Sequence, residues 1–198
     1  MNLMLSDRKR TDRARMNTAK KRICYLVTAA LVVLLDQISK FTVSAGFSHE
    51  GESITVIPGV LDFTFVLNEG ATAGMLADRR WVFMTVSVVA IIAIALYLFF
   101  SKNVGPLAGI ALSAVAGGGI GNMIDRTVSG AVVDFVDVTC IDIFPFNTVF
   151  NVADIFVCVG CAVFIVAIIR EEVADAKAKK AAETASKCDG TDGCGHES

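Results

Sequence analysis

The sequence has only two histidines, His49 and His196, among 198 residues. Zinc proteases of the HExxH type need two histidines one helical turn apart, so this class is excluded. Charged residues are also scarce, at 19%, whereas hydrophobic residues reach 54%, above the roughly 45–50% of soluble domains. This composition argues against a soluble globular enzyme. The net charge of −2 offers no strong attraction to nucleic acid.

Four apolar stretches predict membrane-spanning helices, at residues 23–41, 81–100, 104–124 and 149–169. The second contains twenty consecutive residues without a charge, about the number that a helix needs to cross a ~30 Å hydrocarbon layer. The first outer loop alternates apolar residues at the strand period of two, around a Pro58-Gly59 pair typical of a type II turn. The predicted fold class is an all-α membrane protein of four transmembrane helices with a small extracytoplasmic β-hairpin or sheet.

The distribution of lysine and arginine predicts the orientation, because cytoplasmic flanks retain positive charge. Fourteen of these residues flank the spans on the side of the termini and three lie on the opposite side. Both termini are therefore expected in the cytoplasm, with outer loops at residues 42–80 and 125–148. Residues 1–22 form a basic extension that attracts anionic membrane lipid. Residues 171–198 form a cytoplasmic tail, and for both terminal segments we expect disorder or frayed helix.

Polar residues at membrane depth are the main functional signal, because each costs several kcal/mol unless it is paired. Asp36 and Lys40 lie one turn apart in the outer half of the first span. The ends of the third and fourth spans and the second outer loop bring further polar groups to the same outer boundary, namely Asn122, Asp125, Arg126, Asp134, Asp137, Asn151 and Asp154. We therefore expect these side chains to converge on one site.

The chemistry of such a site is that of paired carboxylates, because no histidine or thiol with a base is present there. Two adjacent carboxylates cannot both ionise, so one holds a proton while the other activates water. A purely structural role, in which the acids pair with Lys40 and Arg126, is the alternative. Spacing does not choose among the acids of the second outer loop, Asp125, Asp134, Asp137 and Asp142.

The glycine-rich run 117–121 lies inside the third predicted span. A phosphate-binding loop needs a preceding strand and an aqueous site. Close helix packing through small residues is the better interpretation.

Four blocks in this order resemble the bacterial lipoprotein signal peptidase family, signal peptidase II. They are DQISK at 36–40, NEGA at 68–71, GGIGNMIDR at 118–126 continuing to VVDF at 132–135, and FNVAD at 150–154. The resemblance covers residues 23–169. It departs from the family pattern at Thr72 and Ala73, where the family usually has alanine and phenylalanine, so substrate fit around that loop is expected to differ.

The resemblance implies an aspartic endopeptidase of the bacterial inner membrane, independent of metal and of any cofactor. It implies cleavage of diacylglyceryl-modified prolipoproteins on the N-terminal side of the lipidated cysteine. By matching position, Asp134 and Asp154 correspond to the catalytic pair. The family positions that bind substrate or support the site are Asp36, Lys40, Asn68, Gly70, Asn122, Asp125, Arg126 and Asn151. We expect the chain to act as a monomer.

Two other functions compete with this interpretation. Intramembrane Asp and Lys also mark the paths of small ion-coupled or proton-coupled transporters. However, the charged groups gather on one side and leave the inner half of the later spans apolar. A non-catalytic scaffold that binds lipoproteins is the third candidate, and it predicts that Asp134→Asn and Asp154→Asn leave the phenotype intact.

Overall fold

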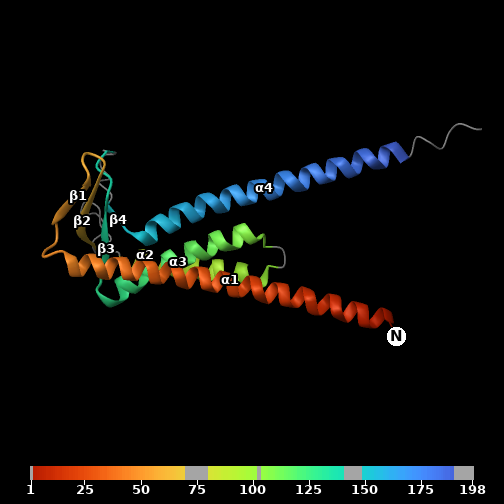
Figure 1. Cartoon of the computed structure of the whole chain (residues 1–198), viewed down its shortest axis with the longest axis horizontal. Helices are drawn as coiled ribbons and strands as arrows, with labels where there is room; N and C mark the ends of the chain where they lie inside the picture. The colour runs from red at the N-terminus through yellow and green to blue at the C-terminus, as the bar shows by residue number, and fades with distance from the viewer. Residues whose placement is uncertain (1, 70–79, 102–103, 141–148, 190–198) are drawn as a thin grey trace, which may run out of the picture.

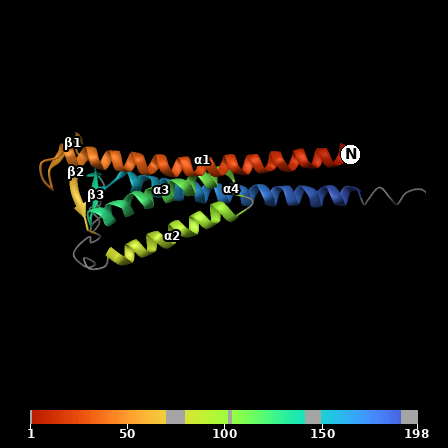
Figure 2. The same cartoon turned by 90° about the horizontal axis from the view of Figure 1, so that it is seen from below.

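The computed structural model describes residues 2–69, 80–101, 104–140 and 149–189. Its helices are α1 (Asn2–Gly46), α2 (Arg80–Phe100), α3 (Pro106–Val128) and α4 (Val152–Asp189). Its strands are β1 (Ser53–Ile57), β2 (Leu61–Asn68), β3 (Val132–Asp137) and β4 (Val149–Phe150). Figures 1 and 2 show the sheet at one end of the helices, with the start of α1 and the end of α4 at the opposite end.

Within the described residues, three helical segments are long and apolar enough to cross a membrane, at Thr18–Gly46, Pro106–Val128 and Val152–Lys177. The second predicted span, residues 81–100, is helical as α2, but its apolar helical segment, Met84–Phe100, is shorter. Many large apolar side chains on the helices are exposed, including Leu34, Val86 and Ile165. Lipid tails would cover such an exterior without free-energy cost.

Helix α3 packs between α1 and α4 at very short range. A Cβ atom at Gly117 would lie 2.7 Å from the backbone oxygen of Ala29 in α1. A Cβ atom at Gly118 would lie 2.6 Å from the backbone oxygen of Ala153 in α4. The glycine-rich run therefore serves close helix packing, as predicted. Pro106 opens α3, where the missing N–H costs no intrahelical hydrogen bond.

The sheet is antiparallel, with strand order β1-β2-β3-β4. The predicted hairpin is present as β1 and β2, and its turn has Gly59 at φ +71° and a 3.0 Å hydrogen bond from Val60 N to Ile57 O. Strand β3 joins β2 with Asn68 opposite Val132 and Val66 opposite Asp134. The sheet therefore connects the first outer loop to the second.

Several element boundaries differ from the predictions. The sequence predicts the fourth span from residue 149, but residues 149–150 form β4 and the helix begins at Val152. The second outer loop contains a strand, β3, whose valines and phenylalanine have high β propensity but show no period of two because the strand is covered on both faces. Helix α1 includes residues 2–22, and α4 continues through residues 171–189. These extensions are rich in Ala, Lys, Arg and Glu, which propagate a helix well.

Candidate active site

Asp154 is held at the first turn of α4 by a reciprocal pair of hydrogen bonds with Asn151. The backbone N–H of Asp154 donates to Asn151 Oδ1 at 3.0 Å, and the backbone N–H of Asn151 donates to Asp154 Oδ2 at 3.2 Å. This is a capping box, in which two otherwise unpaired N–H groups at a helix start are satisfied by side chains. The carboxylate of Asp154 is thereby fixed at the sheet end of α4.

Asp134 lies in β3, with only 2% of its surface exposed. Its Oδ1 accepts a 2.6 Å hydrogen bond from Asn151 Nδ2. Its Oδ2 accepts a 2.9 Å hydrogen bond from Asn68 Nδ2, which belongs to the neighbouring strand β2. The antiparallel register of β2 on β3 brings Asn68 to this position.

Three asparagines connect the two aspartates into one network. Asn122 of α3 donates from Nδ2 to Asp154 Oδ1 at 2.8 Å. Its Oδ1 accepts a 3.0 Å hydrogen bond from Asn151 Nδ2, the same amide group that donates to Asp134. Both carboxylates are thus oriented by N–H donors of the same asparagine network.

A second cluster of charged groups lies directly beside this network. Lys40 Nζ is 2.8 Å from Asp36 Oδ2 and 2.8 Å from Asp125 Oδ2, and it donates to Asn122 Oδ1 at 2.7 Å. Asp36 and Lys40 are almost fully buried, at 0% and 3% exposed. If either the lysine or an aspartate of this cluster lost its charge, the partner would remain buried with an uncompensated charge.

Asp36 also ties α1 to the start of α4. Its Oδ1 accepts a 3.0 Å hydrogen bond from the backbone N–H of Ala153, one residue before Asp154. A first-turn N–H has no intrahelical partner and carries partial positive charge. The charged cluster of Asp36, Lys40 and Asp125 therefore fixes the backbone next to Asp154.

Burial is the largest influence on the acidity of Asp134. Together with the smaller effect of the negative charge of Asp154, burial raises the pKa of this carboxyl group to about 6, against the opposing effects of the hydrogen bonds from Asn68 and Asn151 and of the charge of Lys40. A carboxyl group with such a pKa holds its proton close to neutral pH. This is the behaviour expected of one member of a carboxylate pair that works as acid and base.

The other acidic candidates of the second outer loop have different surroundings. Asp125 is bound by Lys40 and by Gln37, whose Nε2 donates to Asp125 Oδ1 at 2.9 Å. Asp137 lies further along β3, where Thr64 Oγ1 donates to its Oδ2 at 3.1 Å. Asp142 lies outside the described residues. Among the acids that the structure describes, Asp134 and Asp154 are the two bound by the shared asparagine network.

The structure brings together eight of the ten predicted site residues, namely Asp36, Lys40, Asn68, Asn122, Asp125, Asp134, Asn151 and Asp154. Arg126 follows Asp125 on α3, and its Nε is buried without a hydrogen-bond partner within the described residues. Gly70 lies outside the described residues, as do Thr72 and Ala73.

Gln37 belongs to the charged cluster although it is absent from the predicted set. Its Nε2 contacts Asp36 Oδ2, Asp125 Oδ1 and the backbone oxygen of Gly121. Two sequence signals point to it: its place in the DQISK block at 36–40, and the cost of an amide group at membrane depth in an apolar helix.

Comparisons with known proteins agree on one family. The family model for signal peptidase (SPase) II matches residues 28–170. A lipoprotein signal peptidase of Brevibacillus brevis is 40% identical over 141 residues, which cover 71% of this chain and 91% of the relative. One of Symbiobacterium thermophilum is 42% identical over 135 residues, with coverage of 68% and 87%.

A solved structure supports the same relationship at the level of the fold. It is described as a bacterial membrane enzyme, is 32% identical, and superposes with a TM-score of 0.65 over 73% of this chain and 91% of its own. The sequence matches and the fold agree, and the chain belongs to the signal peptidase II family.

Proposed function

We propose that Asp134 and Asp154 are the catalytic carboxylates with which this family member removes signal peptides from prolipoproteins. Membership of the family makes the chain a protease. The cut we propose falls on the N-terminal side of the lipid-modified cysteine. The observation that carries the assignment is the network in which Asn151 donates to Asp134 and caps the helix that bears Asp154.

The reaction needs one proton shared between the two carboxyl groups. The ionised member takes a proton from water as the water oxygen attacks the scissile carbonyl carbon, and the protonated member gives its proton to the carbonyl oxygen. The resulting tetrahedral diol then collapses. The carboxylate that gave up its proton takes one from a diol hydroxyl, the carboxyl group that took the proton from water passes it to the nitrogen, the C–N bond breaks, and the amine of the lipidated cysteine leaves. The raised pKa of Asp134 makes it the better candidate for the resting proton donor.

The substrate enters from the bilayer in this proposal, because its cysteine carries acyl chains that remain in lipid. We propose that α2 joins the three longer apolar helices as a fourth span, with both termini in the cytoplasm of the inner membrane. The site then lies near the outer boundary, where hydrolytic water and lipid meet. Catalysis by a monomer is consistent with a complete network of site residues in one chain.

The hairpin of β1 and β2 is proposed to cover the bound peptide and hold it near attack geometry. Asn68 at the end of β2 reaches Asp134 directly. The exposed apolar side chains Ile54 and Val56 would face the substrate or the lipid around it. A cover of this kind would limit water to the single molecule that reacts.

The decisive experiment measures cleavage of a diacylglyceryl-modified prolipoprotein by the purified wild type, Asp134→Asn and Asp154→Asn, with a metal chelator present. Asp137→Asn is the matched control, because Asp137 lies on the same strand but binds Thr64. We expect full cleavage by the wild type and the control, and none by the other two variants. Retained activity in folded Asp134→Asn or Asp154→Asn would move the catalytic role to another acid.

A further inference from the structure

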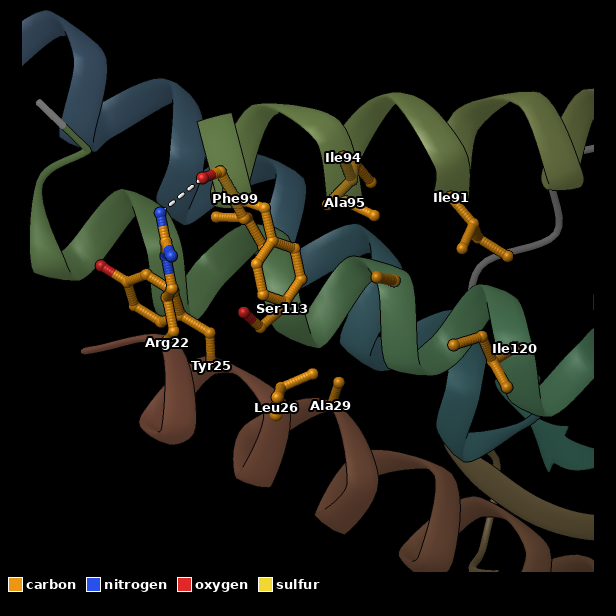
Figure 3. Close-up of a pocket in the computed structure, with 12 residues that line it drawn as sticks. Arg22, Tyr25, Leu26, Ala29, Ile91, Ile94, Ala95, Phe99, Ser113 and Ile120 are labelled. Atoms are coloured by element: carbon orange, nitrogen blue, oxygen red, sulfur yellow. Dashed lines mark hydrogen bonds between the residues drawn. The ribbon is translucent and has the colours of Figure 1, made fainter. Parts of the chain in front are cut away.

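A second feature of the helices lies far from the two aspartates. A cavity of about 130 Å³ opens between α1, α2 and α3, and Figure 3 shows side chains from all three helices around it. Its walls are apolar and include Leu26, Ala29, Ile91, Ala95, Ala116 and Ile120. Arg22 lies at its edge, fourteen residues before Asp36 and therefore about 21 Å from it along α1.

The guanidinium group of Arg22 is the only charged group that lines this cavity among the described residues. One of its N–H groups donates to the backbone oxygen of Phe99 at 2.6 Å, and the group lies 5.8 Å from the centre of the Phe99 ring. Both contacts hold it against the C-terminal end of α2. Arginine has five N–H donors in a planar fork that matches a phosphate.

Further positive charge surrounds this end of the cavity. Lys20 and Lys21 precede Arg22 and are exposed, where the long apolar segment of α1 begins. Lysine and arginine at this level of a membrane attract anionic lipid headgroups by about 1 kcal/mol each. The site therefore combines a cationic edge with an apolar interior in the half of the helices remote from Asp134.

The size of the cavity limits what it can hold. Apolar cavities of about 150 Å³ stay dry and accept small apolar groups. A stretch of acyl chain meets this limit and extends naturally to a phosphate at the edge.

We propose that this cavity holds an acyl chain of an anionic phospholipid whose phosphate binds Arg22. The lipid belongs to the leaflet that contains the N-terminal part of α1. By filling the space between three helices it would stabilise their packing without touching the reacting groups. In this proposal, anionic phospholipid binds the protein at a specific site, in addition to surrounding it as bilayer.

The test measures lipid affinity by native mass spectrometry of the purified, delipidated full chain, titrated with phosphatidylglycerol or with phosphatidylcholine. Arg22→Gln removes the proposed phosphate partner, and Lys21→Gln is the matched control because it removes the same charge from a residue that does not line the cavity. Loss of a charge-assisted hydrogen bond predicts about tenfold weaker binding of phosphatidylglycerol by Arg22→Gln. Lys21→Gln should weaken it less, by no more than the few-fold that a surface charge contributes.

A second pair of variants tests the acyl chain while Arg22 stays intact. Ala95→Leu fills the cavity, whereas Ala93→Leu adds the same volume to an exposed position of the same helix. We expect weaker binding of both lipids by Ala95→Leu only. Equal losses in Arg22→Gln and Lys21→Gln, or unchanged binding by Ala95→Leu, would overturn the proposal. An increase of KM in Ala95→Leu with unchanged lipid affinity would assign the cavity to the substrate instead.

Discussion

Asn151 and Asp154 each bind the other's backbone N–H through a side-chain oxygen at the start of α4. The amide of Asn151 simultaneously donates to Asp134 at 2.6 Å. One residue therefore combines a helix cap with the orientation of both aspartates. The geometry of the site depends on where α4 begins, and two substitutions of Asn151 can separate these roles.

Asn151→Ser keeps a side-chain oxygen for the cap but loses the amide donor, whereas Asn151→Ala loses both. We expect cleavage to fall about 100-fold or more in both variants, because the carboxylates lose their orientation. The alanine variant should be less stable than the serine variant by about 1 kcal/mol, the usual value of an N-cap. Thermal unfolding in detergent and initial cleavage rates measure the two effects. Near wild-type turnover by Asn151→Ser would show that the amide is dispensable.

The raised pKa of Asp134 predicts a pH-dependent effect of Asp134→Asn on stability. The folded state binds this proton up to pH 6 or so, whereas an unfolded aspartate releases it near pH 3.9. Between these values the folded wild type binds more protons, so this group's contribution to stability falls as the pH rises. The asparagine variant lacks this loss. Its stability relative to the wild type should increase by up to about 3 kcal/mol between pH 4 and pH 7.

Chemical unfolding at pH 4, 5, 6 and 7 measures this difference. Asp137→Asn serves as the control, because its carboxylate is bound by a hydroxyl group on the sheet. A pH dependence larger for Asp134→Asn than for Asp137→Asn is the result that supports a proton held on Asp134. A flat difference for Asp134→Asn would mean that the folded protein does not hold the proton on this residue.

The position of the site was predictable because a polar group at membrane depth is costly. Asp36, Asn122 and Asp154 stand out from apolar surroundings for this reason. The contacts among them were not predictable, since they depend on the pairing of β2 with β3 and on the approach of α3 to its neighbours. Strand β3 lacks an alternating pattern, so the residues alone left Asp134 without an assigned element.

Lys40→Met should destabilise the protein by about 3–5 kcal/mol, because it leaves the buried carboxylates of Asp36 and Asp125 uncompensated. Adding Asp125→Asn to Lys40→Met should recover part of this loss. Lys21→Met, at an exposed position of the same helix, is the matched control and should change stability little. Unfolding midpoints of the four proteins provide the measurement. A single variant as stable as the wild type would mean that the cluster is held mainly by its amide partners.

The hairpin proposal predicts an effect on substrate binding rather than on chemistry. Ile54→Thr with Val56→Thr keeps the β-branched shape needed in β1 but makes its exposed face polar. We expect KM for the lipidated substrate to rise with kcat nearly unchanged. Thr55→Val, at the intervening position, is the control. Deletion of residues 54–66 should abolish cleavage but not membrane insertion, and normal cleavage by the deletion would contradict a covering role.

The contact between α3 and α4 predicts opposite outcomes for two adjacent glycines. A methyl group at Gly118 would meet the backbone oxygen of Ala153, whereas one at Gly119 would meet only the end of Ile91 at 3.4 Å. Both changes to alanine gain about 1 kcal/mol of helix propensity. Gly119→Ala should therefore be at least as stable as the wild type.

Gly118→Ala should lose about 1–3 kcal/mol through overpacking. It should also displace the backbone beside Asp154, and a shift of about 1 Å there can lower turnover 100-fold. Unfolding and cleavage of both variants in the same detergent would be compared directly. Because the two substitutions are chemically identical and adjacent, only the distance between α3 and α4 distinguishes them. Equal behaviour of the two variants would mean that the helices separate easily at this point, and the fixed position of Asp154 would then need another explanation.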